Sequence, residues 1–117
     1  MTRIYYISHP DVLIEPKVPI PDWDLSEQGH QRLENMLSRP WVSTLQAVFC
    51  SNEQKAKTAA RRIAEHLRLQ ARILPDLGEF DRSATGYLPP PELDTVVEAV
   101  YVFFDQSIRG WEKVVDV

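Results

Sequence analysis

Short apolar runs alternate along this chain with stretches of helical periodicity, and this alternation restricts the folds that the chain can adopt. The apolar runs are brief, rich in β-branched and aromatic residues and bounded by polar residues or proline, as is typical of buried strands. Strands are predicted at residues 3–8, 45–50 and 72–74, and helices at 26–38, 52–69 and 92–105. The initial order βαβαβ implies parallel pairing through right-handed crossovers. We therefore expect an α/β fold with three layers, α/β/α, around a mainly parallel sheet.

Local signals define several boundaries of these elements. Ser26 is a suitable N-cap for the first helix, and Pro40 ends it. Ser51 and Gln54 have the form of a capping box at the second helix. Four prolines between residues 10 and 21 predict a stiff loop. The last helix fits a 3.6-residue period better than strict alternation, although a strand there remains the alternative.

Size and charge exclude several classes of protein. With 117 residues and 44% hydrophobic content, residues 1–117 are expected to form a single domain. The net charge of −4 disfavours nucleic acid and acidic membranes as partners, so a small substrate is expected. No run approaches the roughly 20 apolar residues of a membrane span. A single cysteine, Cys50, and the lack of a leader predict a cytoplasmic protein.

The three histidines, His9, His30 and His66, are far from one another and from Cys50 in the sequence. None of their spacings is one that closes a zinc site on a helix or knuckle. We therefore predict no metal and no other cofactor.

Polar residues follow two of the predicted strands at the point where each strand ends. Ile4-Tyr5-Tyr6-Ile7 runs into Ser8-His9-Pro10, and Ala47-Val48-Phe49-Cys50 runs into Ser51-Asn52-Glu53-Gln54-Lys55-Ala56-Lys57-Thr58-Ala59. Ligands of α/β folds collect in the crevice at the carboxyl ends of parallel strands. These two exits carry the polar groups needed to hold a phosphoryl group there.

The two motifs resemble those of the histidine phosphatase superfamily, also called phosphoglycerate mutase-like. In that family the first strand ends in Arg-His-Gly, and the second helix opens Ser-x-x-x-Arg-Ala-x-x-Thr-Ala. His9 falls on the nucleophilic histidine, while Ser8 and Pro10 replace the flanking arginine and glycine. Lys55 replaces the arginine of the second motif. Leu25-Ser26-Glu27-Gln28-Gly29 is similar to the family's Leu-Thr-x-x-Gly, which opens the first helix.

The resemblance implies that His9 attacks phosphorus and carries the phosphoryl group. Neutral imidazole can do so when one ring nitrogen is held by a hydrogen bond and the other faces substrate. Ser8, Ser51 and Lys55 are the candidate phosphate-binding residues. Lys55 lies in the first turn of its predicted helix, where an anion is favoured. The alternative for His9 is a loop histidine with a structural hydrogen bond, and for Lys55 a solvated helix lysine. His30 and His66 fit such structural roles.

Leu77-Gly78-Glu79 resembles the family's Leu-x-Glu, whose carboxylate protonates the leaving group. Glu79 is the candidate general acid, and burial beside a bound phosphate would keep its carboxyl from ionising. Asp81 is the fallback for this role. Arg82 and Lys17 are candidate cations, and Tyr87 is a candidate substrate contact on a lid or wall.

A second histidine that completes the phosphate pocket in the family has no counterpart here. Residues Ile108, Trp111, Val114 and Val115 predict a helical stripe that continues to the last residue. We therefore expect an incomplete fold whose open sheet edge would favour association with another chain, as in a homo-oligomer.

The leading hypothesis is a phosphohydrolase that acts on a small phosphomonoester through a phosphohistidine intermediate. A phosphomutase must retain and return the phosphoryl group, and no residue here indicates such retention. The alternative is a catalytically impaired module that keeps the fold and binds a phosphorylated ligand or a protein partner, as Ser8, Pro10 and Lys55 suggest.

Overall fold

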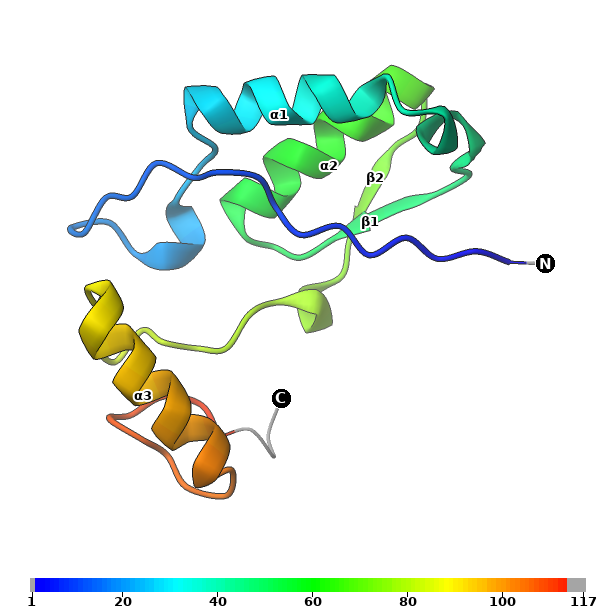
Figure 1. Ribbon diagram of the computed structural model, residues 1–117. Coiled ribbons are helices and arrows are strands. Elements are labelled where there is room, and N and C mark those ends of the chain that lie inside the picture. Colours follow the sequence, from blue (N-terminus) through cyan, green and yellow to red (C-terminus); the bar gives the residue numbers. More distant parts are fainter. Residues whose placement is uncertain (1, 114–117) are drawn as a thin grey trace. The chain divides into compact units, whose positions relative to one another are not determined.

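A computed structural model describes residues 2–113 (Figure 1). The chain forms two compact units. Unit 1 comprises residues 2–14 and 21–78, and unit 2 comprises residues 15–20 and 79–113. Each unit has its own cluster of buried apolar side chains, so each is described by itself.

Unit 1 is built on a parallel pair of strands joined by a helix. β1 (Val48–Cys50) pairs with β2 (Ala71–Ile73) in parallel, and α2 (Gln54–Leu67) makes the connection (Figure 1). Val48 and Cys50 are buried, whereas Phe49 between them is 49% exposed on the opposite face. The α/β class and the parallel pairing are thus confirmed. β1 is shorter than the predicted strand 45–50, and β2 begins one residue before the predicted strand 72–74.

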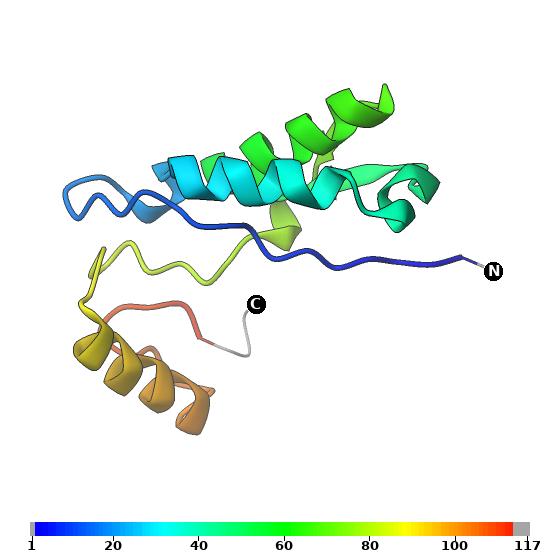
Figure 2. The ribbon, with the colours of Figure 1, turned by 45° about the horizontal axis from the view of Figure 1, so that its top comes forward.

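A second helix, α1 (Glu27–Leu37), packs against α2, as the two views of Figures 1 and 2 show. The Ser26 side chain accepts a hydrogen bond from the Gly29 N–H at 3.1 Å, so the predicted N-cap is confirmed. α1 buries Leu33 and Leu37 in a core that it shares with Ile63 and Ala64 of α2. The helix ends before a 3-10 turn that begins at Pro40.

An ion pair on the surface also joins these helices. Arg62 of α2 donates to a carboxylate oxygen of Glu34 of α1 at 3.0 Å. The hydrogen bond from Arg62 lowers the pKa of the Glu34 carboxyl below its ordinary value. Because both groups are solvated, this pair is a minor addition to the apolar contact between the helices.

The predicted strand at 3–8 is wrong, because no strand forms between residues 2 and 10. The segment follows an extended path on which alternate side chains face the protein and the solvent. Ile4 and Tyr6 are 90% and 95% exposed, whereas Tyr5 stacks on Trp41 with 4.6 Å between ring centroids. Only one side of the run gains apolar burial, so composition alone does not bring it into the sheet.

The segment that follows is fixed against the start of α1. The carbonyl oxygen of Asp11 accepts from the backbone N–H of Ser26 at 3.0 Å, and Arg32 pairs with the Asp11 carboxylate at 2.9 Å. Gly29 makes this approach possible, because a Cβ there would lie 2.1 Å from the Asp11 carbonyl oxygen. The close approach of the Asp11 backbone therefore explains why a glycine stands at the end of the Leu-Ser-Glu-Gln-Gly stretch.

Unit 2 is organised around α3 (Pro90–Val102), close to the predicted helix at 92–105. Val96 and Val100 of α3 pack with Leu88 and Trp111, and the Trp111 indole N–H donates to the Thr85 hydroxyl at 2.8 Å.

Across residues 2–113, no helix has the length and apolarity needed to cross a membrane.

The helical stripe predicted after residue 107 is wrong over the described residues 108–113. The chain turns there instead, with Arg109 at φ 50° and Gly110 at φ 81°. Left-handed conformations at two successive residues cannot continue a right-handed helix. Val114 and Val115, which belonged to the same prediction, lie outside the described residues.

Replacing Gly29 by alanine is expected to destabilise the protein by about 1–3 kcal/mol, because the new methyl group overlaps the Asp11 backbone. This expected net loss already includes the helix-propensity gain of alanine, about 1 kcal/mol. Urea unfolding followed by circular dichroism measures the change. Asn35→Ala, at an exposed position of the same helix, is the matched control. A Gly29→Ala protein as stable as the control would show that the Asp11 segment does not lie against α1.

Cys50 is expected to react slowly with thiol reagents in the folded protein. Its side chain is buried, and this burial raises the pKa of the thiol above its ordinary value. Burial limits access of the reagent, and the raised pKa lowers the fraction of reactive thiolate. Alkylation should therefore be at least about 100-fold slower than in urea-unfolded protein. Labelling followed by mass spectrometry measures both rates, and equal rates would contradict the position of β1 in the core.

Candidate functional site

The residues that follow β1 form a buried polar cluster at the start of α2. Ser51 is 7% exposed and Lys55 is 4% exposed. Lys55 lies in the first turn of α2, one helical step from buried Ala59, so the helix turns its side chain toward the protein. The alternative of a solvated lysine is therefore wrong, and the physical reason is this position on the inner face of α2.

Glu53 connects the two predicted phosphate-binding residues. The Ser51 hydroxyl donates to one carboxylate oxygen of Glu53 at 3.3 Å. The Lys55 ammonium lies 3.3 Å from the other oxygen. The three side chains therefore form a chain of contacts in which one carboxylate bridges a hydroxyl and a cation.

This arrangement replaces the predicted capping box. Glu53, not Ser51, is the N-cap of α2, and its side chain makes no capping hydrogen bond to the helix backbone. Gln54 donates instead to the Thr58 hydroxyl at 3.1 Å. The prediction failed because α2 begins two residues later than assumed, which leaves Ser51 on the turn that leads out of β1.

His9 lies on the extended N-terminal segment of unit 1 and is half-buried. Its Nδ1 lies 2.7 Å from the carbonyl oxygen of Pro10. Because a carbonyl oxygen only accepts, Nδ1 carries the proton and the neutral ring has its lone pair on Nε2. One ring nitrogen is therefore held by a hydrogen bond, which is the first of the two conditions expected of a nucleophilic imidazole. Ser8, beside it, is exposed.

The candidates from the later loop lie in unit 2. Glu79 is exposed and pairs with Arg82 at 3.4 Å, while the Arg82 guanidinium lies 5.7 Å from the Trp111 ring. Burial of Glu79, the condition expected of a proton donor, is not met in the protein alone. Tyr87 is half-buried in the same unit.

Asp81, the fallback for the general acid, has a carboxyl with a lowered pKa, whereas a proton donor requires a raised one. Hydrogen bonds from the side chain and backbone of Ser83 lower the pKa of the Asp81 carboxyl. The Ser83 backbone N–H lies 2.9 Å from a carboxylate oxygen of Asp81. A carboxyl that loses its proton more readily is a poorer proton donor near neutral pH.

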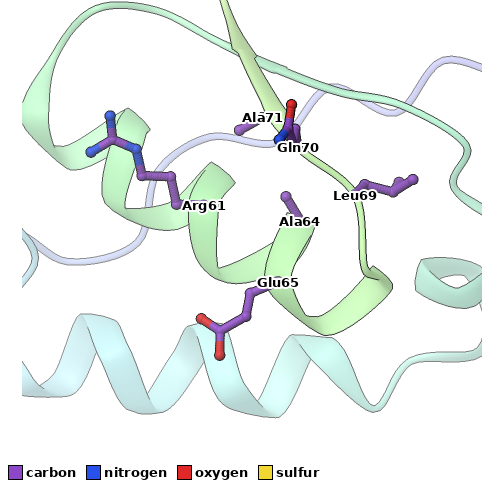
Figure 3. Close-up of a pocket in the computed structure, with 6 residues that line it drawn as sticks. All are labelled: Arg61, Ala64, Glu65, Leu69, Gln70 and Ala71. Atoms are coloured by element: carbon purple, nitrogen blue, oxygen red, sulfur yellow. The ribbon is translucent and has the colours of Figure 1, made fainter.

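A hollow of about 440 Å³ lies elsewhere in unit 1 (Figure 3). It is lined by Arg61, Ala64, Glu65, Leu69, Gln70 and Ala71. These residues surround the last turns of α2 and the start of β2, at the amino end of a parallel strand. In Figure 3 the heads of Arg61 and Glu65 point away from each other. The hollow therefore gathers no converging polar groups, unlike the cluster at the carboxyl end of β1.

Comparison with families of known proteins now identifies the chain. A model described as histidine phosphatase superfamily (branch 1) matches residues 18–111. The chain belongs to the histidine phosphatase superfamily. A search of curated proteins finds no match.

The family match includes most of the predicted site residues but begins after His9. Ser51, Lys55 and Glu79 lie within the matched histidine phosphatase residues, as do Arg82 and Tyr87. Ser8 and His9 precede them, so their assignment depends on the Ser-His-Pro sequence and on the hydrogen bond of the imidazole. Among residues 2–113, no group of three or more histidine, cysteine or acidic side chains is placed to hold a metal ion.

Glu53 contacts both Ser51 and Lys55, but none of the histidine phosphatase motifs points to it. The available signal was the spacing of Ser51, Glu53 and Lys55 at alternate positions from the end of β1 into the first turn of α2. Alternate side chains of such a turn can lie on one side, where a carboxylate meets a hydroxyl and an ammonium. The family pattern concealed this possibility, because Glu53 falls on one of its variable positions.

Replacing Lys55 by methionine is expected to destabilise the protein by about 3–5 kcal/mol, because it removes the ammonium from a nearly buried carboxylate. Adding Glu53→Gln to this variant should restore part of the loss. Urea unfolding measures the natural protein, Lys55→Met and the double variant, with Lys57→Met, two residues further along α2, as the control. Equal losses for Lys55→Met and Lys57→Met would show that the buried ion pair does not contribute to stability.

Proposed function

We propose that this protein is a phosphohydrolase that removes the phosphoryl group from a small phosphomonoester, with His9 as the nucleophile. The observation that carries the proposal is the hydrogen bond from His9 Nδ1 to the Pro10 carbonyl, which holds one ring nitrogen as attack by an imidazole requires. Membership of the histidine phosphatase superfamily supports the choice of phosphoryl chemistry.

In the first step, the Nε2 lone pair forms a bond to phosphorus as the bond to the ester oxygen breaks. Glu79 gives a proton to that oxygen, and the alcohol leaves. In the second step, water attacks the phosphohistidine, the nitrogen–phosphorus bond breaks, and the Glu79 carboxylate takes a proton from the water. The products are the alcohol and inorganic phosphate. Dividing one displacement in two lowers the barrier of each.

Lys55 and the start of α2 are proposed to hold the phosphoryl oxygens. A buried ammonium and the N–H groups of a first helical turn both favour an anion. A lysine provides a point charge instead of the planar fork of arginine, so it holds the oxygens with less control of their orientation. Ser51 would donate a further hydrogen bond, and Arg82 and Tyr87 are the proposed substrate contacts.

The second candidate function is binding of a phosphorylated ligand without turnover. A specific observation favours it, because the Lys55 ammonium already has a carboxylate 3.3 Å away. Ser8 and Pro10 also lack the guanidinium and the backbone donor that the family pattern has at these positions. Such a module would be stabilised by ligand, since a ligand that binds only the folded state raises stability.

The deciding experiment is turnover of an aryl phosphate by the natural full-length protein and by its His9→Asn variant. We expect hydrolysis by the natural protein and a loss of at least about 1,000-fold in kcat/KM for the variant, because the nucleophile is removed. His30→Asn, at an exposed position of α1, is the matched control and should keep its activity.

The intermediate provides a second measurement. Rapid quenching with labelled substrate should trap a phosphoryl group that is lost in acid and kept in alkali, as expected for phosphohistidine. Activity that survives in His9→Asn refutes the assignment of the nucleophile. Phosphate-dependent stabilisation with no turnover by the natural protein establishes the binding module instead.

A further inference from the structure

The backbone of Asp11 is held against the start of α1 by several contacts. Its carbonyl oxygen accepts from the Ser26 backbone N–H at 3.0 Å and from the Ser26 hydroxyl at 3.2 Å. Gly29 lets this carbonyl approach the helix, because a Cβ there would lie 2.1 Å from the oxygen. These contacts fix the position of Asp11 relative to α1, which is itself held by the core of unit 1.

The Asp11 carboxylate adds side-chain contacts with the same helix. Arg32 donates to one of its oxygens at 2.9 Å. In the amide orientation that satisfies both of its neighbours, Gln28 donates to the other oxygen at 3.0 Å and accepts from Arg32 at 3.2 Å. The backbone and the side chain of Asp11 are therefore both bonded to α1 or to its N-cap.

A single proline connects this anchor to His9. The Pro10 carbonyl, which lies 2.7 Å from His9 Nδ1, belongs to the same planar peptide group as the Asp11 nitrogen. The ring of Pro10 fixes its φ angle, and a residue before proline is biased toward extended conformations. Few torsions therefore separate the imidazole from Asp11. On the other side of His9, Ser8 is exposed and Ile7 is 40% exposed, so the chain there is packed less closely.

We propose that Asp11 is a positioning residue that transmits the placement of α1 to the His9 imidazole. The inference rests on the proposed function, because the orientation of the ring matters there for the attack on phosphorus. A misplacement of about 1 Å in a reacting group can slow a reaction about 100-fold. None of the family motifs gives Asp11 a role, since it lies between the Ser-His-Pro and Leu-Ser-Glu-Gln-Gly stretches.

The test compares kcat and KM for an aryl phosphate in the natural full-length protein and in Gly29→Ala. The added methyl group displaces the Asp11 carbonyl by about 1 Å or more. We expect kcat to fall by about 10- to 100-fold. KM should stay within about twofold, because Lys55 and the start of α2 are proposed to bind the phosphoryl group. Circular dichroism establishes that the variant is folded under the conditions of the assay.

The His9 ring provides a readout that a general loss of stability does not change. Nitrogen NMR of isotopically labelled protein, at an alkaline pH where the ring is neutral, reports which ring nitrogen carries the proton. The natural protein should show the proton on Nδ1, whereas Gly29→Ala should show both tautomers, because the Pro10 carbonyl no longer faces Nδ1. Comparison with the spectrum of His9→Asn assigns the signals to this ring.

Asp11→Ala is the second variant, and it decides the question if Gly29→Ala does not fold. It removes the contacts of the carboxylate with Arg32 and leaves the backbone hydrogen bond to Ser26. The fall in kcat should therefore be smaller, about threefold or more, again with little change in KM. The His9 ring signals should change in the same direction as in Gly29→Ala.

Each variant has a matched control on α1. Glu34→Gln breaks another exposed ion pair of this helix, the one with Arg62, and is the control for Asp11→Ala. Asn35→Ala places an alanine at an exposed position of the helix and is the control for Gly29→Ala. Both controls should keep the natural kcat and the natural His9 ring signals.

The inference and the proposed function fail in different ways. A fall in kcat with nearly constant KM and altered His9 signals, seen in the two variants and not in the controls, supports the inference. Unchanged kcat, unchanged ring signals, a change confined to KM, or a loss shared by the controls overturns it and leaves the proposed function in place. Absence of turnover by the natural protein overturns the proposed function, and the role of Asp11 with it.

Discussion

The packing of α2 on the β1–β2 pair is the interaction on which unit 1 depends. Ala60, Ile63 and Ala64 on one side of the helix meet Val48 and Cys50 on one side of the sheet. Small alanine side chains let the helix approach the strands closely, so a sheet of only two short strands still has a dense core. The same contact fixes the direction of the first turn of α2. It thereby places the Lys55 side chain inside the protein, where its charge can act on a ligand or on Glu53.

The sequence was sufficient to predict the central part of this fold. The strand–helix–strand unit from Val48 to Ile73 and the N-cap at Ser26 produce local signals that agree with the packing. The N-terminal run was mispredicted because its composition is that of a strand, whereas pairing depends on a partner that composition does not specify. The stripe at Ile108 and Trp111 failed for a related reason, since Gly110 introduces a left-handed turn that overrides the apolar spacing.

The roles of the candidate site residues stay predictions, and the sequence motifs left one of the contacts among these residues unpredicted. Family motifs pointed to His9, Ser51 and Lys55, and in the structure the His9 Nδ1 lies 2.7 Å from the Pro10 carbonyl oxygen. The partner of Lys55 could not be obtained from the motifs, because Glu53 occupies a position where the family pattern allows any residue. Buried charges are seldom isolated, so a lysine on the inner face of a helix was itself a reason to look for an acidic neighbour.

The exposed side chains of Ile4 and Tyr6 have a consequence for how the protein behaves at high concentration. Residues 4–7 combine high β-propensity with no charge and no proline, and part of their apolar surface faces solvent. Segments of this kind readily pair with copies of themselves, and the resulting ladders grow into insoluble assemblies. Arg3 precedes the run, and a charge in this position opposes the stacking of such segments.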